Sequence, residues 1–327
     1  MNNRSEQVKT FLTSIATMNV WVVGDGMLDH YIWGNVHRIS PEAPVPVVAI
    51  EKDTYRLGGA CNVALNLQKL GASVRFFGPI GADEAGRMMQ QLLTDNHIHY
   101  PSMDASSTVS TIVKTRVIAR NQQLFRLDRE KVFTPDQVRY LEHQIEQGLA
   151  TEQVTAVIVS DYAKGSVTQS LLNKLCELKQ QYGFFLAIDP KPGHGLNYSG
   201  ADLLKPNQAE ARQLAKLEAS NASLTAIAQA ILHAHRVRYL AVTLGEDGLA
   251  IIHESGKMDI IPTVTKEVFD VSGAGDTALV ALTAAFCAKA TPEEAGWFAN
   301  LLSGLVIKKV GTASTTPEEI LNAASKA

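Results

Sequence analysis

Two aspartates and two glycines stand close together late in the sequence, in the segment DVSGAGDT at residues 270–277. The apolar run that follows, residues 278–286, predicts a buried helix whose first turn would contain the glycines. Free backbone N–H groups and the positive end of the helix dipole can hold an anion there, and glycine lets a phosphate approach the backbone. Asp276 would be repelled by that anion, unless its task is to take a proton from a hydroxyl that attacks phosphorus. This combination indicates phosphoryl transfer.

Two other interpretations fit the same segment. Because Asp and Ser favour helix starts, the segment can be no more than a cap with a glycine-rich turn. Residues 273–278 also match the G-x-G-x-x-A pattern of dinucleotide-binding turns, but that pattern normally follows the first strand of a βαβ unit, and this copy lies near the C-terminus. The acidic residue further on, Glu293, follows a Thr-Pro pair and so opens a helix. The sequence contains no G-x-x-x-x-G-K-[ST] motif, which excludes a P-loop enzyme.

The composition is that of a globular chain with a large core. The sequence has 327 residues, 46% of them hydrophobic, and a formal net charge of −3, so no broad basic field favours nucleic acid or an anionic membrane. Cys61, Cys176 and Cys287 are far apart and form no C-x-x-C pair, so we expect reduced cysteines in a cytoplasmic protein. The N-terminal residues lack the apolar region of a signal peptide, and the apolar run after Asp276 is too short to span a bilayer.

Short apolar runs alternate with helical segments along most of the chain. We expect strands at 20–23, 74–77, 154–160, 184–188, 238–244, 249–253 and 257–262, and helices at 6–18, 83–95, 135–149, 167–181, 293–309 and 317–326. This order predicts an α/β fold of three layers with a mostly parallel central sheet. In such sheets ligands bind beyond the carboxyl ends of the strands. Asp25, Asp161, Lys164 and Asp189 follow strands in this way, although each alone would suit a turn or a solvated surface.

Two β-rich segments interrupt this alternation. The first, residues 35–57, has too many prolines at 40–46 for a central strand and suits an edge strand at 45–50. The second, residues 108–128, alternates about a turn at 121–123. We expect the two segments to form a small sheet that covers the site as a lid. The whole chain, residues 1–327, would then be a single domain with this lid.

Several residues beside the lid segments could face a sugar. Asp25 lies at a predicted strand end, and Asp29 is expected in the loop that follows. Gly58 and Gly59 would allow a ligand to approach the backbone closely, although a glycine pair alone more often forms a turn. Asn62 could form a hydrogen bond with a sugar hydroxyl.

The segment KPNQAE at 205–210 allows two interpretations. Asn207 and Glu210 have the spacing of a helix capping box, which these residues alone favour. They could also face Mg²⁺–ATP, directly or through water, because Mg²⁺ prefers few protein carboxylates and several waters. Gly245 and Gly248, after the strand predicted at 238–244, indicate first a hairpin turn.

Over nearly its whole length the sequence resembles the ribokinase-like carbohydrate kinases, and within them the heptose 7-phosphate kinases of lipopolysaccharide precursor synthesis. The D-x-x-G-A-G-D motif at 270–276 is specific only for the broad family. Longer segments carry the closer resemblance: GDGMLD at 24–29, RISPEAPVPV at 38–47, GGACNVA at 58–64, RVIARNQQ at 116–123, RLD at 126–128, SDYAKG at 160–165 and KPNQAE at 205–210. The sequence departs from the usual heptose kinase residues at Gly26, Cys61, Ala163, Lys205 and Ser272, but no departure removes a chemical group that the mechanism needs.

The resemblance implies a role for each candidate residue around the phosphate. Asp276 corresponds to the catalytic base, and Gly273, Ala274 and Gly275 correspond to the anion hole. ATP and Mg²⁺ would be bound by the nucleotide motif, Asn207, Gln208, Ala209 and Glu210, with Glu210 facing Mg²⁺ directly or through water. Thr243, Gly245, Gly248 and Asn300 correspond to the region around the nucleotide. Asp270 and Ser272 correspond to residues that hold a monovalent cation such as K⁺.

For the acceptor, the resemblance implies a phosphosugar bound under the lid by Asp25, Gly58, Gly59 and Asn62. Asp161 is a further substrate candidate, and the phosphate at position 7 requires cations, for which Arg38, Arg120, Arg126 and Lys164 are candidates because Arg can bind phosphate bidentately. The product would be heptose 1,7-bisphosphate. A homodimer is expected, because an exposed lid sheet can pair with a second subunit.

Other functions are kept as alternatives. The chain could be another phosphosugar or nucleoside kinase of the same family, or a catalytically silent binding protein on this fold. An NAD-dependent oxidoreductase is a more distant possibility. Many heptose kinases also carry an adenylyltransferase domain with an H-x-G-H motif, and this sequence ends at Ala327 without one, so we expect either a stand-alone kinase or the kinase part of a longer protein.

Overall fold

A computed structural model of the chain describes residues 2–101, 109–120, 122–217, 222–263, 269–309 and 311–326. Within these residues the central element is an eight-stranded sheet with the order β12-β11-β10-β9-β8-β7-β1-β4. In chain order its strands are β1 (Asn19–Gly24), β4 (Ser73–Phe77), β7 (Ala156–Ser160), β8 (Phe185–Asp189), β9 (Leu203–Leu204), β10 (Tyr239–Thr243), β11 (Leu249–His253) and β12 (Met258–Ile261). Neighbours from β4 to β10 run parallel, and β11 and β12 are added antiparallel, which confirms the mostly parallel sheet.

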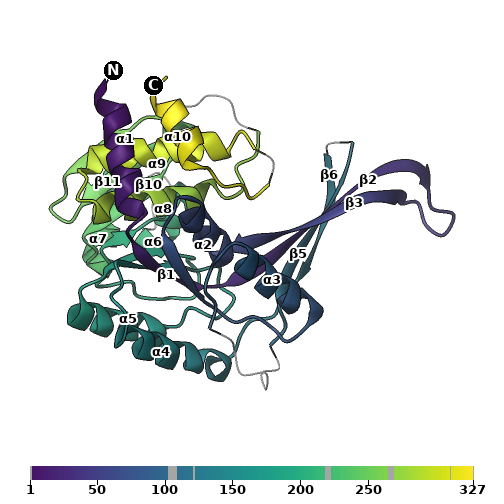
Figure 1. Cartoon of the computed structure of the whole chain (residues 1–327), viewed down its shortest axis with the longest axis horizontal. Helices are drawn as coiled ribbons and strands as arrows, with labels where there is room; N and C mark the ends of the chain where they lie inside the picture. Colours follow the sequence, from purple (N-terminus) through teal and green to yellow (C-terminus); the bar gives the residue numbers. More distant parts are fainter. Residues whose placement is uncertain are drawn as a thin grey trace.

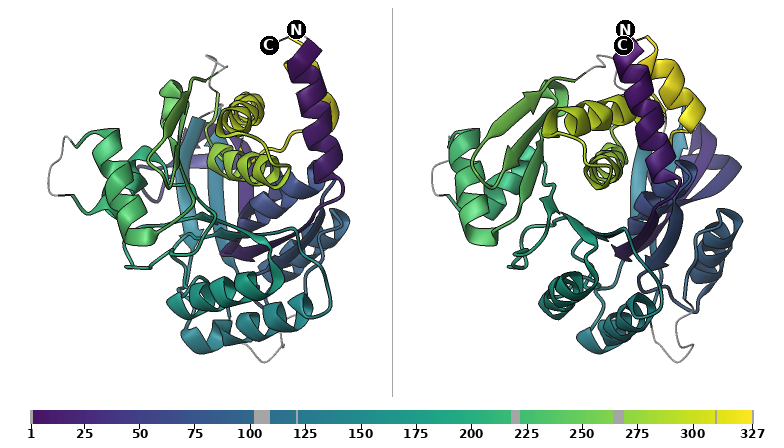
Figure 2. Two further views of the ribbon diagram at one scale, coloured as in Figure 1. Left: turned by 90° about the vertical axis from the view of Figure 1, so that its left-hand side faces the viewer. Right: turned by 60° about the vertical axis from the view of Figure 1, so that its left-hand side comes forward.

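Helices cover both faces of this sheet (Figure 2). In chain order they are α1 (Asn2–Ile15), α2 (Ala60–Lys69), α3 (Glu84–Asp95), α4 (Pro135–Leu149), α5 (Gln169–Tyr182), α6 (Gln208–Ala215), α7 (Leu224–His235), α8 (Ala274–Cys287), α9 (Pro292–Val306) and α10 (Pro317–Ala324). The three-layer α/β architecture predicted from the sequence is therefore confirmed. None of these helices has the length and apolar character needed to cross a membrane.

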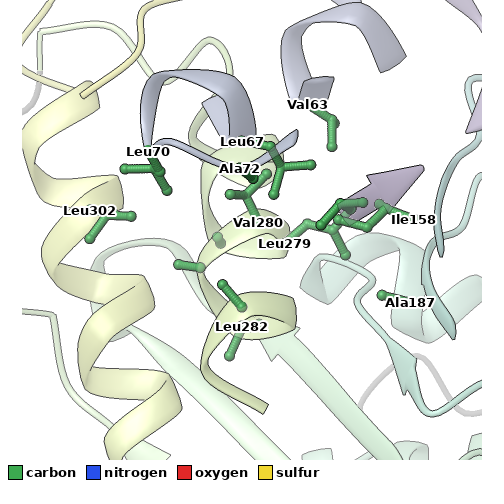
Figure 3. Close-up of a cluster of buried hydrophobic side chains, with 14 of the residues drawn as sticks. Val63, Leu67, Leu70, Ala72, Ile158, Ala187, Leu279, Val280, Leu282 and Leu302 are labelled. Atoms are coloured by element: carbon green, nitrogen blue, oxygen red, sulfur yellow. The ribbon is translucent and has the colours of Figure 1, made fainter. Parts of the chain in front are cut away.

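Alternating strand residues separate two hydrophobic cores. Val22 of β1 packs in the core that contains α1, α2, α8, α9 and α10, whereas its neighbour Val23 packs in the core that contains α4, α5, α6 and α7. Figure 3 shows part of the first core, where Leu67 of α2 and Leu279 of α8 lie near Ile158 of β7. The apolar run predicted as a buried helix is α8, which is buried almost all round from residue 276 to 286.

A second sheet forms the lid, with the strand order β3-β2-β5-β6. Its strands are β2 (Gly26–Ile39), β3 (Pro46–Gly59), β5 (Ile112–Ala119) and β6 (Gln122–Arg129), and Figure 1 shows them extending away from the body of the molecule. The predicted small sheet is confirmed, and β3 lies at its edge as expected. Residue 108 and Asn121, at the start and the turn of the second predicted segment, lie outside the described residues.

The lid begins earlier than the sequence suggested. β2 starts at Gly26, directly after Asp25, so Asp29 lies within a strand and the prediction of a loop there is wrong. The physical reason is that Gly24, with φ +153, and Gly26 carry the chain from one sheet directly into the other. At its other end β3 runs through Gly58 and Gly59, which therefore end a strand and lead into α2 instead of forming a turn.

Candidate active site

Charged side chains form a row at the carboxyl edge of the large sheet. Asp25 follows β1, Asp161 follows β7, Asp189 ends β8 and Lys205 follows β9. Because the four strands are consecutive in the sheet, these residues stand at neighbouring strand ends. The Lys205 ammonium lies 3.0 Å from Asp189 Oδ2, and Lys205 is only 3% exposed. The prediction that polar residues gather at this edge is therefore confirmed, and it is the edge at which open α/β sheets bind ligands.

A cleft opens above this row and has two parts. The first part, of about 600 Å³, is lined by Tyr162, Asp189, Lys205, Gly275 and Asp276 together with the predicted nucleotide residues Asn207, Gln208, Ala209, Glu210, Thr243 and Gly245. The second part, of about 670 Å³, shares Thr243, Gly245, Val271 and Gly275 with the first and continues to Gly248 and Asn300. The structure thus brings together all eight residues predicted around the nucleotide. The polar first part suits phosphates, and apolar residues in the second part, among them Leu249 and Ile307, suit a nucleoside.

The start of α8, like that of α2, has no side-chain cap and differs in this from the starts of three other helices. Those three helices have a threonine N-cap followed by proline: Thr134, Thr291 and Thr316. Each of these side chains forms a capping box with the first turn of its helix. α8 instead begins at Gly273, whose φ is +81 and which offers no side-chain acceptor to the first turn. A Cβ on Gly275 would lie 3.5 Å from the Lys205 ammonium, so a buried cation faces the positive end of this helix. Two positive features that face one cavity favour an anion between them.

Asp276 lies in the first turn of α8 and is 5% exposed. Asn62 Nδ2 donates a hydrogen bond of 2.6 Å to its Oδ2, and the Tyr162 hydroxyl donates one of 3.0 Å to its Oδ1. Burial, with Asp189 nearby, raises the pKa of Asp276 to about 6, while the hydrogen bonds from Asn62 and Tyr162 and the charge of Lys205 act against that rise. Near neutral pH the carboxylate is therefore ionised and yet basic enough to accept a proton.

Asn207 and Glu210 form the capping box that their spacing predicted. Asn207 Oδ1 accepts from the Glu210 N–H at 2.9 Å, and Glu210 Oε2 accepts from the Asn207 N–H at 3.0 Å. The other oxygen, Glu210 Oε1, accepts from Lys191 at 2.9 Å. Glu210 and Asp189 both line the cleft, and no cluster of three or more His, Cys, Asp or Glu side chains suited to a metal occurs in the part of the chain that the structure describes. This sparse set of oxygen donors fits Mg²⁺ carried by nucleotide phosphates and water.

Asp270 connects two loops beside the start of α8. Its Oδ1 accepts from the Ser272 N–H at 2.9 Å and its Oδ2 accepts from the Gly311 N–H at 2.7 Å. Burial acts to raise the pKa of Asp270, but these hydrogen bonds and the charge of Arg116 outweigh burial and lower it. Asp270 is therefore held as a carboxylate, which is the state that a monovalent cation would require.

Two residues predicted to bind the sugar make buried hydrogen bonds within the protein. Asp25 is 0% exposed, and its two oxygens accept four hydrogen bonds from the loop of residues 161–166. Asn62 is also 0% exposed, and its amide holds Asp276. In this conformation the side chains of Asp25 and Asn62 hold the site through these contacts, and their contacts with a sugar stay a prediction.

The paired glycines are likewise explained by the packing of the chain on itself. A Cβ on Gly58 would lie 2.6 Å from Asp29 Oδ2, and a Cβ on Gly59, whose φ is +56, would lie 2.4 Å from the Asp25 carbonyl oxygen. Asp29 itself is 3% exposed and accepts a hydrogen bond of 2.7 Å from Arg116. These glycines therefore allow β2 and β3 to pass close together, and close approach of a ligand is not needed to explain them.

Three of the four cations predicted to hold the substrate phosphate are spread along the lid, and the fourth, Lys164, lies in the loop after β7. Arg38 is exposed near the far end of β2, nine residues or roughly 30 Å along the strand from Asp29. Arg120, with φ +49, lies beyond the end of β5 and donates to the Val36 carbonyl in the same outer half. Arg126 and Lys164 instead lie nearer the body, where they form ion pairs with Asp128 and Glu130 respectively. The structure therefore does not bring the four together.

Asp161, the remaining substrate candidate, lines the cleft but is 5% exposed. Its Oδ1 accepts from the Ala163 N–H at 2.8 Å, and its Oδ2 lies 3.1 Å from His194 Nε2. Burial raises the pKa of Asp161 to about 6, and the nearby Asp25 acts in the same direction.

Three residues near the site, Tyr162, Arg116 and Lys205, were given no role from the sequence. Tyr162 binds Asp276 across 114 residues of chain, and Arg116 binds Asp29 across 87. The alternation of side chains along the strands could have identified Arg116. β5 pairs with β2 so that Arg116 lies opposite Tyr31, and Tyr31 is on the same face of β2 as Asp29, two residues earlier. No local pattern pointed to Tyr162, since its contact depends on the loop that Asp25 holds.

Comparisons with known proteins agree with this geometry. The sequence model of the pfkB family carbohydrate kinases matches residues 18–319. The chain belongs to the pfkB family of carbohydrate kinases. It is therefore a phosphotransferase with an alcohol group as acceptor, as predicted from the sequence.

Curated relatives of this carbohydrate kinase are longer than the chain. It is 39% identical over 309 residues to the "Bifunctional protein HldE" of Sulfurimonas denitrificans, which covers 93% of this chain and 64% of the relative. It is also 39% identical over 316 residues to the protein of the same name from Salmonella dublin, which covers 97% of this chain and 65% of the relative. The chain thus spans just under two thirds of the length of these relatives.

Solved structures of other sugar kinases have the same fold. Phosphofructokinase-2 from Escherichia coli in complex with potassium superimposes with a TM-score of 0.75 at 19% identity, over 94% of this chain and 98% of that one. Ribokinase from Arabidopsis thaliana complexed with ribose and ATP superimposes with a TM-score of 0.70 at 18% identity, over 94% and 98% of the two chains. The fold of this carbohydrate kinase is therefore ribokinase-like.

Proposed function

We propose that this carbohydrate kinase transfers the γ-phosphate of ATP to the anomeric hydroxyl of D-glycero-β-D-manno-heptose 7-phosphate and produces the 1,7-bisphosphate. The observation that carries the chemistry is Asp276, a buried carboxylate at an uncapped helix start that faces a cleft large enough for a nucleotide. The choice of sugar is supported by the heptose kinase segments at 38–47 and 116–123 and by the identity to the HldE proteins. The reaction would supply a precursor of ADP-heptose and the lipopolysaccharide core.

In this mechanism Asp276 accepts the proton of the anomeric hydroxyl while that oxygen attacks the γ-phosphorus in line. The carboxylate is kept ionised by Asn62 and Tyr162 and is made more basic by burial. Backbone N–H groups of residues 273–276 stabilise the negative charge on the transferring phosphoryl group, which is usually the largest contribution in such reactions.

Lys205 is the side chain we add to the phosphate site. Its ammonium is buried, faces the first turn of α8 and has Asp189 as its ion-pair partner. A cation beside the positive end of a helix is unfavourable unless an anion lies between them, and the γ-phosphate would supply that anion. Lys205 would then share its charge between Asp189 and the phosphoryl group during transfer.

The cofactors of the proposal are Mg²⁺ and a monovalent cation. When bound, Mg²⁺ would neutralise charge on the ATP phosphates. Glu210, directly or through water, and Asp189 are the side chains that would hold it, because both carboxylates line the phosphate part of the cleft. Asp270 and Ser272 would hold K⁺ and so stabilise the loop before α8. A related phosphofructokinase-2 contains potassium, which supports testing this ion.

For the phosphate of the acceptor we retain Arg126 and Lys164 and add Arg116. These cations lie on or beside the inner part of the lid, and each is paired with a carboxylate. A substrate phosphate would exchange places with one of these carboxylates, whereas Arg38 and Arg120 lie too far along the lid to reach it.

The proposal includes a homodimer formed through the lid, in the cytoplasm, where ATP is available. Exposed apolar side chains are concentrated on the lid at Ile39, Val45, Ile50, Phe125 and Leu127, with 45–64% of each surface accessible. Such a group on an extended sheet is a common feature of interaction surfaces, and a second lid would cover it.

The function is tested by measuring ADP release with a panel of acceptors: D-glycero-β-D-manno-heptose 7-phosphate, sedoheptulose 7-phosphate, fructose 6-phosphate and ribose. We expect turnover with the heptose phosphate only. Turnover with another sugar would leave the kinase mechanism in place but reject the substrate. A lack of turnover with all four, in a protein that binds ATP, would reject the proposed function.

A further inference from the structure

The loop of residues 161–166 connects two buried carboxylates, one after a strand of the large sheet and the other in a helix. Asp25 is at the end of β1 and Asp276 is in the first turn of α8. Asp25 Oδ2 accepts from the Tyr162 N–H at 2.8 Å and from the Lys164 N–H at 3.0 Å. Its Oδ1 accepts from both the N–H and the hydroxyl of Ser166. The conformation of this loop is therefore fixed by Asp25, and Ala163, with φ +57, turns the chain inside it.

The side chain of Tyr162 then extends from this loop to the base. Its hydroxyl donates to Asp276 Oδ1 at 3.0 Å, and Tyr162 and Asp276 both line the first cavity. Asn62, which holds Oδ2, is 0% exposed. We therefore take Oδ1, next to the phenol, as the oxygen that the acceptor hydroxyl would approach. Tyr162 occupies one lone pair of that oxygen and leaves the other for the substrate.

We propose that Tyr162 is a positioning residue for the catalytic base, and that Asp25 acts on the reaction through Tyr162 and has no contact with the sugar. This inference rests on the proposed kinase mechanism, but it assigns roles to two residues that the family match does not assign. Tyr162 orients the carboxylate and stabilises its ionised form. Asp25 holds the backbone that delivers the phenol.

Several charged groups act on this pair. Asp276 is faced by Lys205 and Asp189 from the strand ends, and Tyr162 is also near Asp29 of the lid. Burial and the neighbouring carboxylates raise the pKa of Tyr162, so the phenol remains a hydrogen-bond donor over the whole working range of pH. Loss of this donor would remove a group that lowers the pKa of Asp276, and the base would become protonated at a higher pH.

The experiment is the pH profile of kcat and kcat/KM for Tyr162→Phe between pH 5 and 9, with whichever sugar the wild type phosphorylates. We expect a roughly tenfold lower kcat at pH 7, an unchanged KM for ATP, and an acid limb moved upward by roughly one pH unit. The matched control is Tyr140→Phe, because the Tyr140 hydroxyl is buried without a partner among the residues that the structure describes. The control should retain the wild-type profile.

A wild-type rate and an unmoved acid limb in Tyr162→Phe would overturn the role of Tyr162.

The role of Asp25 is tested with Ser166→Ala, which removes one of its donors. If this change lowers kcat in the wild type but not in Tyr162→Phe, Asp25 acts through Tyr162; equal losses in both backgrounds would overturn that link. The pKa of Asp276, measured by carboxyl ¹³C NMR without sugar, should also rise in Tyr162→Phe. This last test separates failure of the inference from failure of the proposed substrate.

Discussion

The edge of the large sheet and the inner face of the lid both carry charged side chains, but they hold them differently. At the sheet edge, Lys205 and the open first turn of α8 face one cavity, and Asp276 is fixed beside them by two hydrogen bonds. On the lid, Arg116 and Arg126 are each paired with a carboxylate of the lid itself. The first region is organised before a phosphate arrives, whereas the second must exchange partners to bind one. Under the proposed function we therefore expect the sheet edge to determine the rate of transfer and the lid to determine the affinity for the acceptor.

The largest effect should follow removal of the base at the sheet edge. Asp276→Asn should lower kcat by roughly 10³-fold, because the acceptor hydroxyl would lose its proton acceptor. ATP binding, measured by calorimetry, should be retained. A variant with near wild-type kcat would show that Asp276 is not the base.

Removal of the buried cation should have the next largest effect on rate. Lys205→Met should lower kcat by about 100-fold while the KM for the sugar changes little, since its charge acts on the transferring phosphoryl group. Steady-state kinetics at saturating ATP measure this. If the main effect were on the KM of the sugar, the division between the two regions would be wrong.

The pH dependence of stability provides a test without substrate. The pKa of Asp276 in the folded protein, about 6, lies above the value of about 3.9 for an unfolded aspartate. The folded state therefore binds this proton more tightly, and the free energy of unfolding should fall as pH rises through the interval from about 4 to 6. In urea unfolding, the free energy of unfolding of the wild type should fall by up to about 3 kcal/mol more than that of Asp276→Asn across this interval. Parallel curves would contradict the raised pKa.

The smallest effect is expected on the lid. Arg126→Met should raise the KM for the phosphosugar by about tenfold and leave kcat and the KM for ATP unchanged. Arg120→Met, an exposed arginine near the turn of the same hairpin, is the matched control and should have no effect. Equal effects of the two changes would mean that position on the lid does not decide phosphate binding.

The sequence was most informative where local patterns determine structure. The apolar run after Asp276 placed α8, the Thr-Pro pairs at 134–135 and 291–292 placed the starts of α4 and α9, and the alternation of apolar runs with helical segments indicated the mostly parallel sheet. The Asn207–Glu210 spacing also predicted its capping box, because both partners lie within one helical turn. The lid was found from its prolines and its alternation.

The roles of buried polar residues could not be predicted in the same way. Asp25 and Asn62 were expected at the sugar, but Tyr162, which binds Asp25, lies 137 residues away and Asp276, which binds Asn62, lies 214 residues away, so only the fold brings them together. The length of β2 separates Arg38 from the site, and no local pattern around this residue showed that distance. Tyr162 was missed because its contact depends on a loop that another residue holds.

The most direct test of the account is the ³¹P NMR spectrum of the product formed from ATP and D-glycero-β-D-manno-heptose 7-phosphate, by the wild type and by Asp276→Asn. The account predicts a second phosphorus signal coupled to the anomeric proton, beside the retained 7-phosphate, with the wild type and almost none with the variant. A new signal at another hydroxyl, or an equal signal from Asp276→Asn, would contradict transfer to the anomeric oxygen by this base.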